Sequence, residues 1–317
     1  MVWAAAVPLP AQNKLAERVV RVDSLMQIRY HRAKIDTAYV IRPRTRFTVS
    51  ARFNMTGSRI DMEGFYEGKR LRSRTKADYK KTVSVAVNYL GLSGTLSLNP
   101  AKLLGRYRDF EASLVYYGKH YGGDLIYQDA KNYHGYLDLE DYPRMELPPN
   151  AFKMRSLNAS GYFVFNHRRF SYPAAMTQGY IQRRSAGSWM LALSAQGMQG
   201  RYTDTHVSKL SITNVGVGGG YGYNYVPARR WLIHISVLPT FIVYNYSSLK
   251  YDESRVPLRY DFPEVIITTR SAVVWQVRHN QFAALSGVYY FSDNGTKSSL
   301  DIENTRWRAR IAYGFRF

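Results

Sequence analysis

The chain closes on residues 305–317, which read TRWRARIAYGFRF. Odd positions from Trp307 to Phe317 are all apolar or aromatic. The even positions include four arginines, Arg306, Arg308, Arg310 and Arg316. Because side chains alternate between the two faces of a strand, one face is apolar and the other carries the guanidinium groups. This polarity is typical of an outer-membrane barrel, with apolar residues toward lipid and polar ones toward a wet lumen. An amphipathic edge strand of a soluble sheet is the alternative.

Eleven further runs of alternating polarity precede this stretch, and they predict an all-β fold. The runs occupy 46–55, 82–89, 92–98, 109–116, 122–128, 156–165, 188–196, 214–225, 231–244, 265–278 and 282–291. Short links alternate with long polar ones at 56–81, 129–152, 197–211, 247–263 and 292–304, as expected for periplasmic turns and extracellular loops. Residues 45–317 are therefore predicted to form a closed antiparallel transmembrane β-barrel of about twelve strands, with ten or fourteen as alternatives.

The amino-acid composition of the chain limits the kinds of molecule that it is expected to bind. The 317 residues carry a formal net charge of +21 with pI ≈ 10.0, which favours an acidic partner such as nucleic acid, phosphate-rich lipid or an anionic solute. A soluble nucleic-acid binder would gather its basic residues in a patch beside a buried core, so the uninterrupted apolar stripes argue against nucleic acid. Cysteine is absent, which excludes disulfides and thiol catalysis. We expect no cofactor.

The N-terminus has the composition of a targeting segment. Residues 1–11 resemble the end of a secretory signal peptide, with cleavage between Ala11 and Gln12. The basic beginning of such a peptide is missing, so a disordered N-terminus is the alternative. Residues 12–44 are predicted to form a short periplasmic segment. Its helical spacing rests on Leu15, Val19, Val22 and Met26.

One segment, residues 166–187, interrupts the alternation of link lengths, because it is long where a short periplasmic turn is expected. It contains Pro173 and Gly179 and has no sustained apolar face, so we predict that it does not span the membrane. It should lie at the periplasmic mouth or fold into the lumen as a constriction. The candidate constriction residues are His167, Arg168, Arg169, Tyr172, Gln178, Arg183 and Arg184.

The same region carries a family resemblance. Residues 163–175 and 178–187, together with 36–39 (DTAY), 153–156 (KMRS) and 223–229 (YNYVPAR), resemble a Bacteroidetes family that is catalogued as a domain of unknown function. Its members are regarded as outer-membrane barrels. The resemblance extends over nearly the whole chain after the signal segment. It implies a location and an architecture but no activity, and it assigns no catalytic residue.

Arginine placement is the strongest functional signal. The first and last strands of a closed barrel are neighbours, so arginines of the first run should lie near those of the last. A confined cluster of this kind repels itself unless carboxylates or bound anions compensate, and arginine rings favour anions in pores. We expect a channel or binding barrel for small anionic solutes, or a structural or assembly barrel with a plugged lumen and internally neutralised arginines. The expected track is Arg46, Arg52, Arg270, Arg278, Arg306, Arg308, Arg310 and Arg316, with Asp109 and Glu111 across the barrel.

Two further partners are expected in the cell outer membrane of a Gram-negative bacterium. A basic cluster in the first long link suits the phosphates of lipopolysaccharide, with a solvated basic loop as the alternative. Its members are Lys69, Arg70, Arg72, Arg74 and Lys76. The terminal Phe317 resembles the signal by which outer-membrane barrels are recognised by the barrel assembly machinery. Outer-membrane lipid is the remaining contact.

Catalysis finds little support. His167 near Ser171 is compatible with a membrane-embedded hydrolase that acts on lipid. However, neighbouring arginines should lower the basicity of the histidine, and no carboxylate adjacent in sequence orients it. His134 with Asp138 and Asp141 could hold a metal, yet such residues in a loop are usually surface polar groups. We therefore expect a protein that is not an enzyme and has no metal site.

Overall fold

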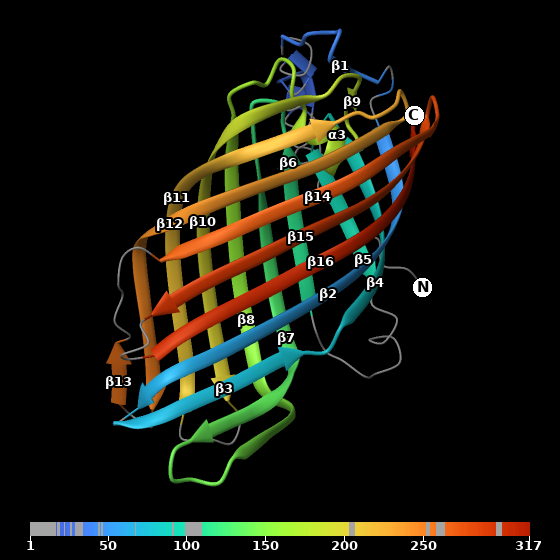
Figure 1. The fold of residues 1–317 in the computed structure, drawn as a ribbon. Helices are drawn as coiled ribbons and strands as arrows, with labels where there is room; N and C mark the ends of the chain where they lie inside the picture. Colours follow the sequence, from blue (N-terminus) through green and yellow to red (C-terminus); the bar gives the residue numbers. More distant parts are fainter. Residues whose placement is uncertain are drawn as a thin grey trace, which may run out of the picture.

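The structure is a computed structural model that describes residues 34–43, 45, 47–66, 68–90, 92–98, 110–202, 207–251, 254–257, 264–295 and 300–317, with scattered residues between 17 and 28. Twelve antiparallel strands close into a barrel, because the last strand pairs with the first along its whole length (Figure 1). The predicted closed antiparallel barrel of twelve strands is confirmed. None of the described helices is long and apolar enough to cross a membrane.

The strands of the ring follow one another in sequence order. They are β2 (Phe47–Tyr66), β4 (Lys80–Tyr89), β5 (Leu92–Leu98), β6 (Phe110–Tyr117), β7 (Tyr121–Leu139), β8 (Met145–Val164), β10 (Ala186–Tyr202), β11 (Val207–Tyr225), β12 (Trp231–Tyr251), β14 (Val265–Arg278), β15 (Gln281–Gly295) and β16 (Leu300–Arg316). Two strands extend the wall at one end: β3 (Lys69–Ala77) pairs with β2 and β7, and β13 (Ser254–Pro257) pairs with β12.

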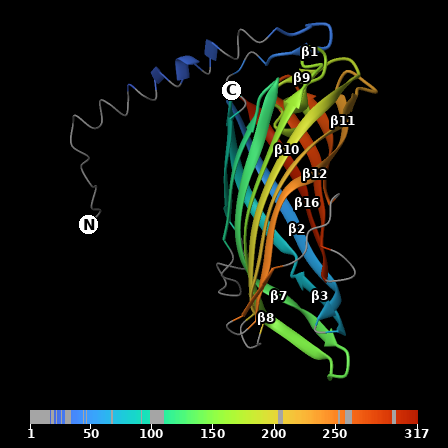
Figure 2. The same ribbon diagram turned by 90° about the vertical axis from the view of Figure 1, so that its left-hand side faces the viewer.

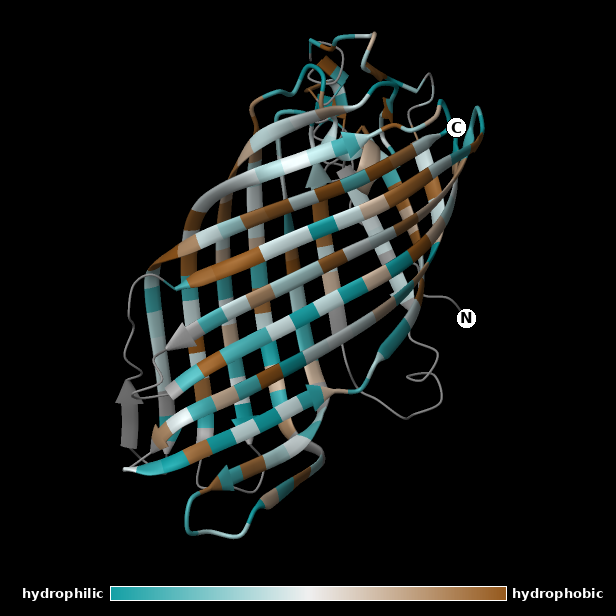
Figure 3. Cartoon of the chain, in the orientation of Figure 1, coloured by the Kyte–Doolittle hydropathy of each residue, from teal (hydrophilic) through white to brown (hydrophobic). Residues whose placement is uncertain are grey.

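Successive side chains of each strand point to opposite faces of the wall, and the two faces differ in polarity. On β10, Trp189, Leu191 and Leu193 point outward and are exposed, while Ser188 and Met190 point inward and are buried. The same polarity recurs around the ring and forms an apolar outer band, and Figure 3 shows hydrophobic residues alternating with more hydrophilic ones along the strands. Exposed aromatic rings mark the edge of this band at the end with short turns, where Trp231 and Trp275 stack 5.7 Å apart. An apolar outer band bordered by aromatic rings identifies an outer-membrane β-barrel.

The polarity reverses at the opposite end of the barrel. There the inward side chains are apolar and buried, and they form a second core of Ile60, Met62, Ala130, Tyr133, Phe152, Met154, Met198, Leu210, Ile212 and Ile302. Outward positions in this region carry charges such as Arg59, Arg72 and Glu63. This arrangement is that of a soluble sheet, so this part of the wall stands in water beyond the lipid.

The reversal corrects the expectation of long loops. Most described residues of the links 56–81, 129–152, 197–211, 247–263 and 292–304 are strand. The β7–β8 hairpin projects beyond the rest of the barrel at the end opposite the C-terminus, and β3 lies at the same end (Figures 1 and 2). The loop prediction was wrong because it depended on apolar residues facing outward. Above the lipid the wall keeps its backbone pairing but no longer needs an apolar outer face.

Both the C-terminus and the short turns lie at one end of the barrel, which we assign as periplasmic (Figure 1). The short turns lie at Leu90, at 118–120, at 226–230 and at 279–280. The described residues between 17 and 28 are helical, whereas the signal segment 1–11 and the helix positions Leu15, Val19, Val22 and Met26 lie outside the described residues.

Residues 165–185 fold into the barrel at this periplasmic end and contribute no strand to its wall. The short helix α3 (Tyr172–Met176) is wholly buried, and its N-terminus is capped by Ser171, whose Oγ accepts a hydrogen bond from the amide of Ala174. The following strand β9 (Ile181–Gln182) pairs with β1 (Val40–Ile41), and this pairing attaches the N-terminal segment to residues 165–185. We call residues 165–185 the plug. The next wall strand, β10, starts at Ala186, two residues before the expected strand start at Ser188.

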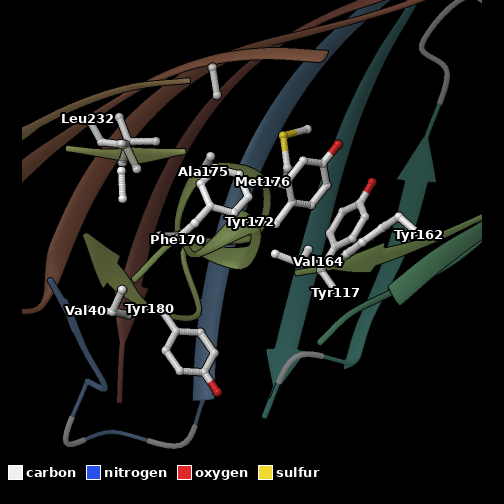
Figure 4. Packing of buried hydrophobic residues seen from close by; sticks show 14 of the residues in the cluster. Val40, Tyr117, Tyr162, Val164, Phe170, Tyr172, Ala175, Met176, Tyr180 and Leu232 are labelled. Carbon is white, nitrogen blue, oxygen red and sulfur yellow. The ribbon is translucent and has the colours of Figure 1, made fainter. Parts of the chain in front are cut away.

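The plug is held by an apolar cluster shared with the wall. Phe170, Tyr172 and Met176 of the plug pack against Tyr117, Tyr162 and other wall residues, as Figure 4 shows. Tyr172 lies edge-on to Tyr117 at 5.7 Å and against Tyr162 at 4.7 Å. The lumen is therefore bounded by the plug on the periplasmic side and by the second apolar core on the other.

Candidate functional site

A cavity of about 50 Å³ lies inside the barrel next to the plug, and we call it the arginine chamber. Among the residues that the structure describes, its lining includes four arginines and one carboxylate: Arg52, Arg306, Arg308, Arg310 and Asp124. Met176 and Thr177 of the plug form its periplasmic side. The volume is enough for a few water molecules or one small anion.

The arginines meet because of strand register at the seam of the barrel. Arg310 on β16 lies opposite Asn54 on β2, and Ala312 lies opposite Arg52, so inward positions of the two strands share one face. The Arg310 Nε donates a hydrogen bond of 2.7 Å to the Asn54 amide oxygen. The Arg52 Nε donates to the Ser50 hydroxyl at 2.9 Å. Both acceptors are neutral, so these two hydrogen bonds orient the guanidinium groups without being ion pairs.

The carboxylate of the chamber is already committed to an ion pair. Arg270 on β14 donates to Asp124 on β7 at 2.8 Å, and their side chains are 2% and 5% exposed. The Ser160 hydroxyl donates to the other oxygen of Asp124 at 2.8 Å, and the Tyr117 hydroxyl donates at 3.4 Å to the oxygen that Arg270 binds. This cluster crosses the lumen between strands that are far apart in the wall.

A second cavity of about 50 Å³ lies beyond this ion pair, toward the apolar core at the far end. Asp124, Ile126, Tyr290 and Arg306 line both cavities, so they form the layer between them. The rest of the second cavity's described lining is neutral and mixes apolar side chains such as Met154 and Ile266 with polar ones such as Asn158, Gln196 and Thr268. Positive charge is thus concentrated on the plug side of the layer.

Asp124 was missed in the sequence, although a signal for it exists. It shares parity with Gln128 inside the short run 122–128, opposite Leu125 and Tyr127. An acidic residue on the wet face of a membrane strand should find a cation within the lumen. Asp109 and the side chain of Glu111, which were expected to face the arginines, lie outside the described residues.

The other arginines of the expected track lie elsewhere. Arg46 falls outside the described residues. Arg278 is exposed at the periplasmic mouth, because a register shift between Gln276 and Arg278 ends the alternation that pointed it inward. Arg316 is buried beneath the plug, where its Nε donates to the Gln178 carbonyl at 3.3 Å. It therefore anchors the plug and does not line the chamber.

Asn224 on β11 is the main polar anchor of the plug. It is 0% exposed, and its amide nitrogen donates to the Ser171 carbonyl at 2.9 Å and to the Gln182 side-chain oxygen at 3.0 Å. Its own oxygen is 2.7 Å from the Nδ1 atom of His234. A second link joins the hydroxyls of Tyr172 and Ser236 at 3.3 Å.

The candidate constriction residues divide into two groups. Tyr172 and Gln178 are buried inside the barrel, whereas His167 is half-buried, and Arg168, Arg169, Arg183 and Arg184 are exposed at the periplasmic mouth. Arg169 pairs with Asp36 of the N-terminal segment at 3.3 Å. The arginines of the plug therefore face the periplasm and not the chamber.

The expected lipid-facing cluster lies on β3, on the charged outer face beyond the apolar band. Arg70 and Arg72 both pair with Glu63, at 2.8 and 3.1 Å, and Arg74 pairs with Asp61 at 3.0 Å. Lys69 lies 3.5 Å from Asp141, and Lys76 is opposite Arg59 and His134 in the sheet. Contact with lipopolysaccharide stays a prediction for this cluster.

Phe317 completes the seam with its backbone. Its amide donates to the Phe47 carbonyl at 2.8 Å, and its carbonyl accepts from the Phe47 amide at 3.1 Å. Its ring points outward and is 65% exposed, next to Phe315. A role in recognition by the assembly machinery stays a prediction.

The hydrolase pair is not assembled. Ser171 is buried as the cap of α3, while His167 stacks on His120 with ring centroids 3.7 Å apart. Burial lowers the pKa of His167, and His120, Lys119 and Arg168 add to that effect. His134 lies 3.6 Å from Asp78, and within the described part of the chain no group of three potential metal ligands occurs.

The placement of the plug gives a labelling prediction. A cysteine in place of Ser171, which is 0% exposed, should not react with a bulky polyethylene-glycol maleimide on intact cells. A cysteine in place of Tyr142, in the turn between β7 and β8, should react, because Tyr142 is 59% exposed beyond the apolar band. Gel-shift analysis measures both, and efficient labelling at position 171 would contradict the placement.

Solved structures similar to this chain are outer-membrane barrels with different activities. The outer membrane protease OmpT of Escherichia coli shares 8% identity at a TM-score of 0.44, over 86% of this chain and 97% of that one. The β domain of the Bordetella autotransporter BrkA shares 11% at 0.36, over 86% and 100%. An outer membrane channel of Pseudomonas putida F1 shares 12% at 0.32, over 87% and 98%. These similarities assign no activity to this chain.

Sequence comparison identifies the family. No curated protein sequence matches the chain. A family match extends over residues 34–317, from the strand that holds the plug to the last residue of the barrel. The chain belongs to the family described as Domain of unknown function (DUF4421).

Proposed function

We propose that this protein is a gated barrel for small anionic solutes in the outer membrane of a Gram-negative bacterium of the Bacteroidetes. The observation that carries the proposal is the composition of the arginine chamber. Four arginines line it, and its described carboxylate, Asp124, already binds a fifth arginine, Arg270. A chamber with this excess of positive charge attracts anions and repels cations.

Binding in the chamber would exchange water for guanidinium contacts. The Arg52 Nε donates to the neutral hydroxyl of Ser50 and the Arg310 Nε to the neutral amide oxygen of Asn54, so these two contacts orient both guanidinium groups at the chamber wall. Each guanidinium can donate two parallel hydrogen bonds to an oxyanion. Several contacts of this kind, none of them dominant, allow an anion to enter and to leave again.

The plug supplies the gate. It covers the periplasmic side of the chamber with Met176 and Thr177, and polar anchors such as Asn224 hold it in place. Passage requires the plug to shift, and the second apolar core must also open at the far end. The closed form seen here fits a barrel that loads or releases an anion in steps.

A second candidate function is a structural or assembly barrel with a permanently closed lumen. It is favoured by the extent of burial around the plug, where Phe170, Tyr172 and Ala175 are each 0% exposed. In that case the arginines would serve to fill and rigidify the lumen. Bilayer recordings separate the two functions.

The charge of the chamber gives a selectivity prediction. Changing Arg308 and Arg310 together to serine should shift the reversal potential in a salt gradient from anion-selective toward zero, because it removes half of the lining arginines. The measurement is the reversal potential in planar lipid bilayers. Arg70→Ser with Arg72→Ser is the matched control, since that pair lies on the outer face and should leave selectivity unchanged. Cation selectivity of the native protein would contradict the proposal.

A further inference from the structure

A larger basin lies at the periplasmic end, outside the plug. Its volume is about 570 Å³, which falls in the range of small-molecule sites. Its basic lining residues are Arg183, Arg184, Arg229, Arg230, Arg278 and His279. They come from three separate places: the end of the plug, the turn between β11 and β12, and the end of β14 with the turn that follows it. The basin is therefore formed by the fold and not by one basic run in the sequence.

The backbone of the basin is fixed although its side chains are exposed. The Arg183 amide donates to the Tyr39 carbonyl at 2.7 Å, which attaches the plug to the N-terminal segment. The Arg184 carbonyl accepts from the side chain of Gln182 at 2.9 Å. The Arg230 carbonyl accepts from the Gln276 amide at 2.8 Å. The guanidinium groups thus extend from anchored positions around one hollow.

The charge of the basin has no counterpart in its lining. Among the described residues around the basin there is no aspartate or glutamate. The described ion pair of Arg169 with Asp36, at the same end of the barrel, involves no residue of the basin lining. Like charges gathered in a concave site repel one another, and a bound polyanion relieves that repulsion.

The chemistry of the lining selects the kind of anion. Guanidinium groups form planar, bidentate contacts with phosphate and carboxylate oxygens. A phosphate monoester carries about -1.5 to -2 charges near neutral pH, whereas a carboxylate carries one, so phosphate offers more charge in the same volume. Five arginines around a basin of this size match a compact ligand with several phosphates better than one with several carboxylates.

We propose that this basin binds a small soluble molecule with at least two phosphate groups, taken up from the periplasmic side. The site is separate from the arginine chamber, because the plug lies between them. The inference does not depend on conduction through the lumen. It also gives one common role outside the lumen to Arg278, which was expected in the luminal track, and to Arg183 and Arg184, which were expected at the periplasmic mouth or in a constriction.

Inorganic tripolyphosphate is the probe for a titration-calorimetry test on the full-length barrel in a non-ionic detergent. Saturable binding is expected for the native protein. Arg229→Gln with Arg230→Gln, and separately Arg183→Gln with Arg184→Gln, should each weaken it by about tenfold or more, because each pair removes charge-assisted hydrogen bonds. A mobility shift on boiling confirms that each variant is folded. Citrate, measured in parallel, should bind more weakly than tripolyphosphate.

The luminal variant Arg308→Gln with Arg310→Gln is the matched control and should bind tripolyphosphate as tightly as the native protein. Loss of binding in this variant, or unchanged binding in both basin variants, would overturn the proposed site. Citrate bound as tightly as tripolyphosphate would overturn the assignment to phosphate. Bilayer selectivity of the basin variants should stay that of the native barrel, so failure of the basin is distinguishable from failure of the anion channel.

Discussion

Replacing Asn224 with alanine should open the barrel and produce steady anion conductance that is rare in the native protein. The substitution removes the donor to the Ser171 carbonyl and to the Gln182 side chain, and it leaves His234 without its partner at 2.7 Å. Buried polar groups that lose their partner cost roughly 1–3 kcal/mol each. Because two of the three groups, Ser171 and Gln182, belong to the plug, most of the cost falls on its closed position and not on the barrel wall.

Single-channel recording in planar bilayers measures the effect as open probability. Tyr313→Phe is a suitable control, because it removes an exposed hydrogen bond of 3.0 Å to Gln281 at the same end of the barrel without touching the plug. Gln182→Ala should act in the same direction as Asn224→Ala, since Gln182 also binds the Ser171 amide at 3.0 Å. If neither variant conducts, although the shift of their gel mobility on boiling shows that both are folded, the structural barrel is favoured over the gated one.

The barrel itself could be predicted because its signal is repeated in every strand that crosses lipid. An exposed apolar residue at each second position, as in Trp189, Leu191 and Leu193, has one physical explanation in a long antiparallel chain. The seam was predictable for the same reason. Parity alone puts Arg52 and Arg310 on the inner face of neighbouring strands.

The alternation of apolar and polar residues did not predict how far the strands extend beyond the lipid. Beyond the lipid, Ile60 and Met62 turn inward while Glu63 turns outward, which is the ordinary pattern of a soluble sheet. A chain that changes from one pattern to the other has no single period to detect, and the charged residues there look like loop sequence. Strand pairing through such segments depends on neighbours distant in sequence.

The site was partly predictable for a similar reason. Arg308 and Arg310 follow from alternation, but the bulge before Arg278 is a property of the turn and not of the strand pattern. The partnership of Asp124 with Arg270 joins strands separated by 146 residues. The basin at the mouth depends on where the plug ends, and no periodicity describes an irregular segment.

Replacing Asp124 with asparagine should cause the largest loss of stability. The change leaves the Arg270 guanidinium, whose side chain is 2% exposed, without its carboxylate in the middle of the lumen. Breaking a buried pair by removing one partner costs about 3–5 kcal/mol, because the remaining charge is neither solvated nor compensated. The free energy of unfolding, measured by urea titration in lipid vesicles, should fall by that amount. An unchanged value would show that water solvates Arg270 or that a bound anion neutralises it.

Asp129→Asn is the matched control, since Asp129 lies on the same strand and pairs with Arg155 at 3.2 Å on the outer face. The Arg155 side chain is 63% exposed, so this change should cost at most about 1 kcal/mol. The double variant Asp124→Leu with Arg270→Met tests the cause directly. It removes both charges together, and replacing a buried ion pair with apolar residues of similar volume is often close to neutral. We expect the double variant to recover most of the lost stability. A double variant as unstable as Asp124→Asn would contradict the charge explanation. It would show that the barrel is stabilised by the hydrogen bonds of Ser160 and Tyr117 to this carboxylate.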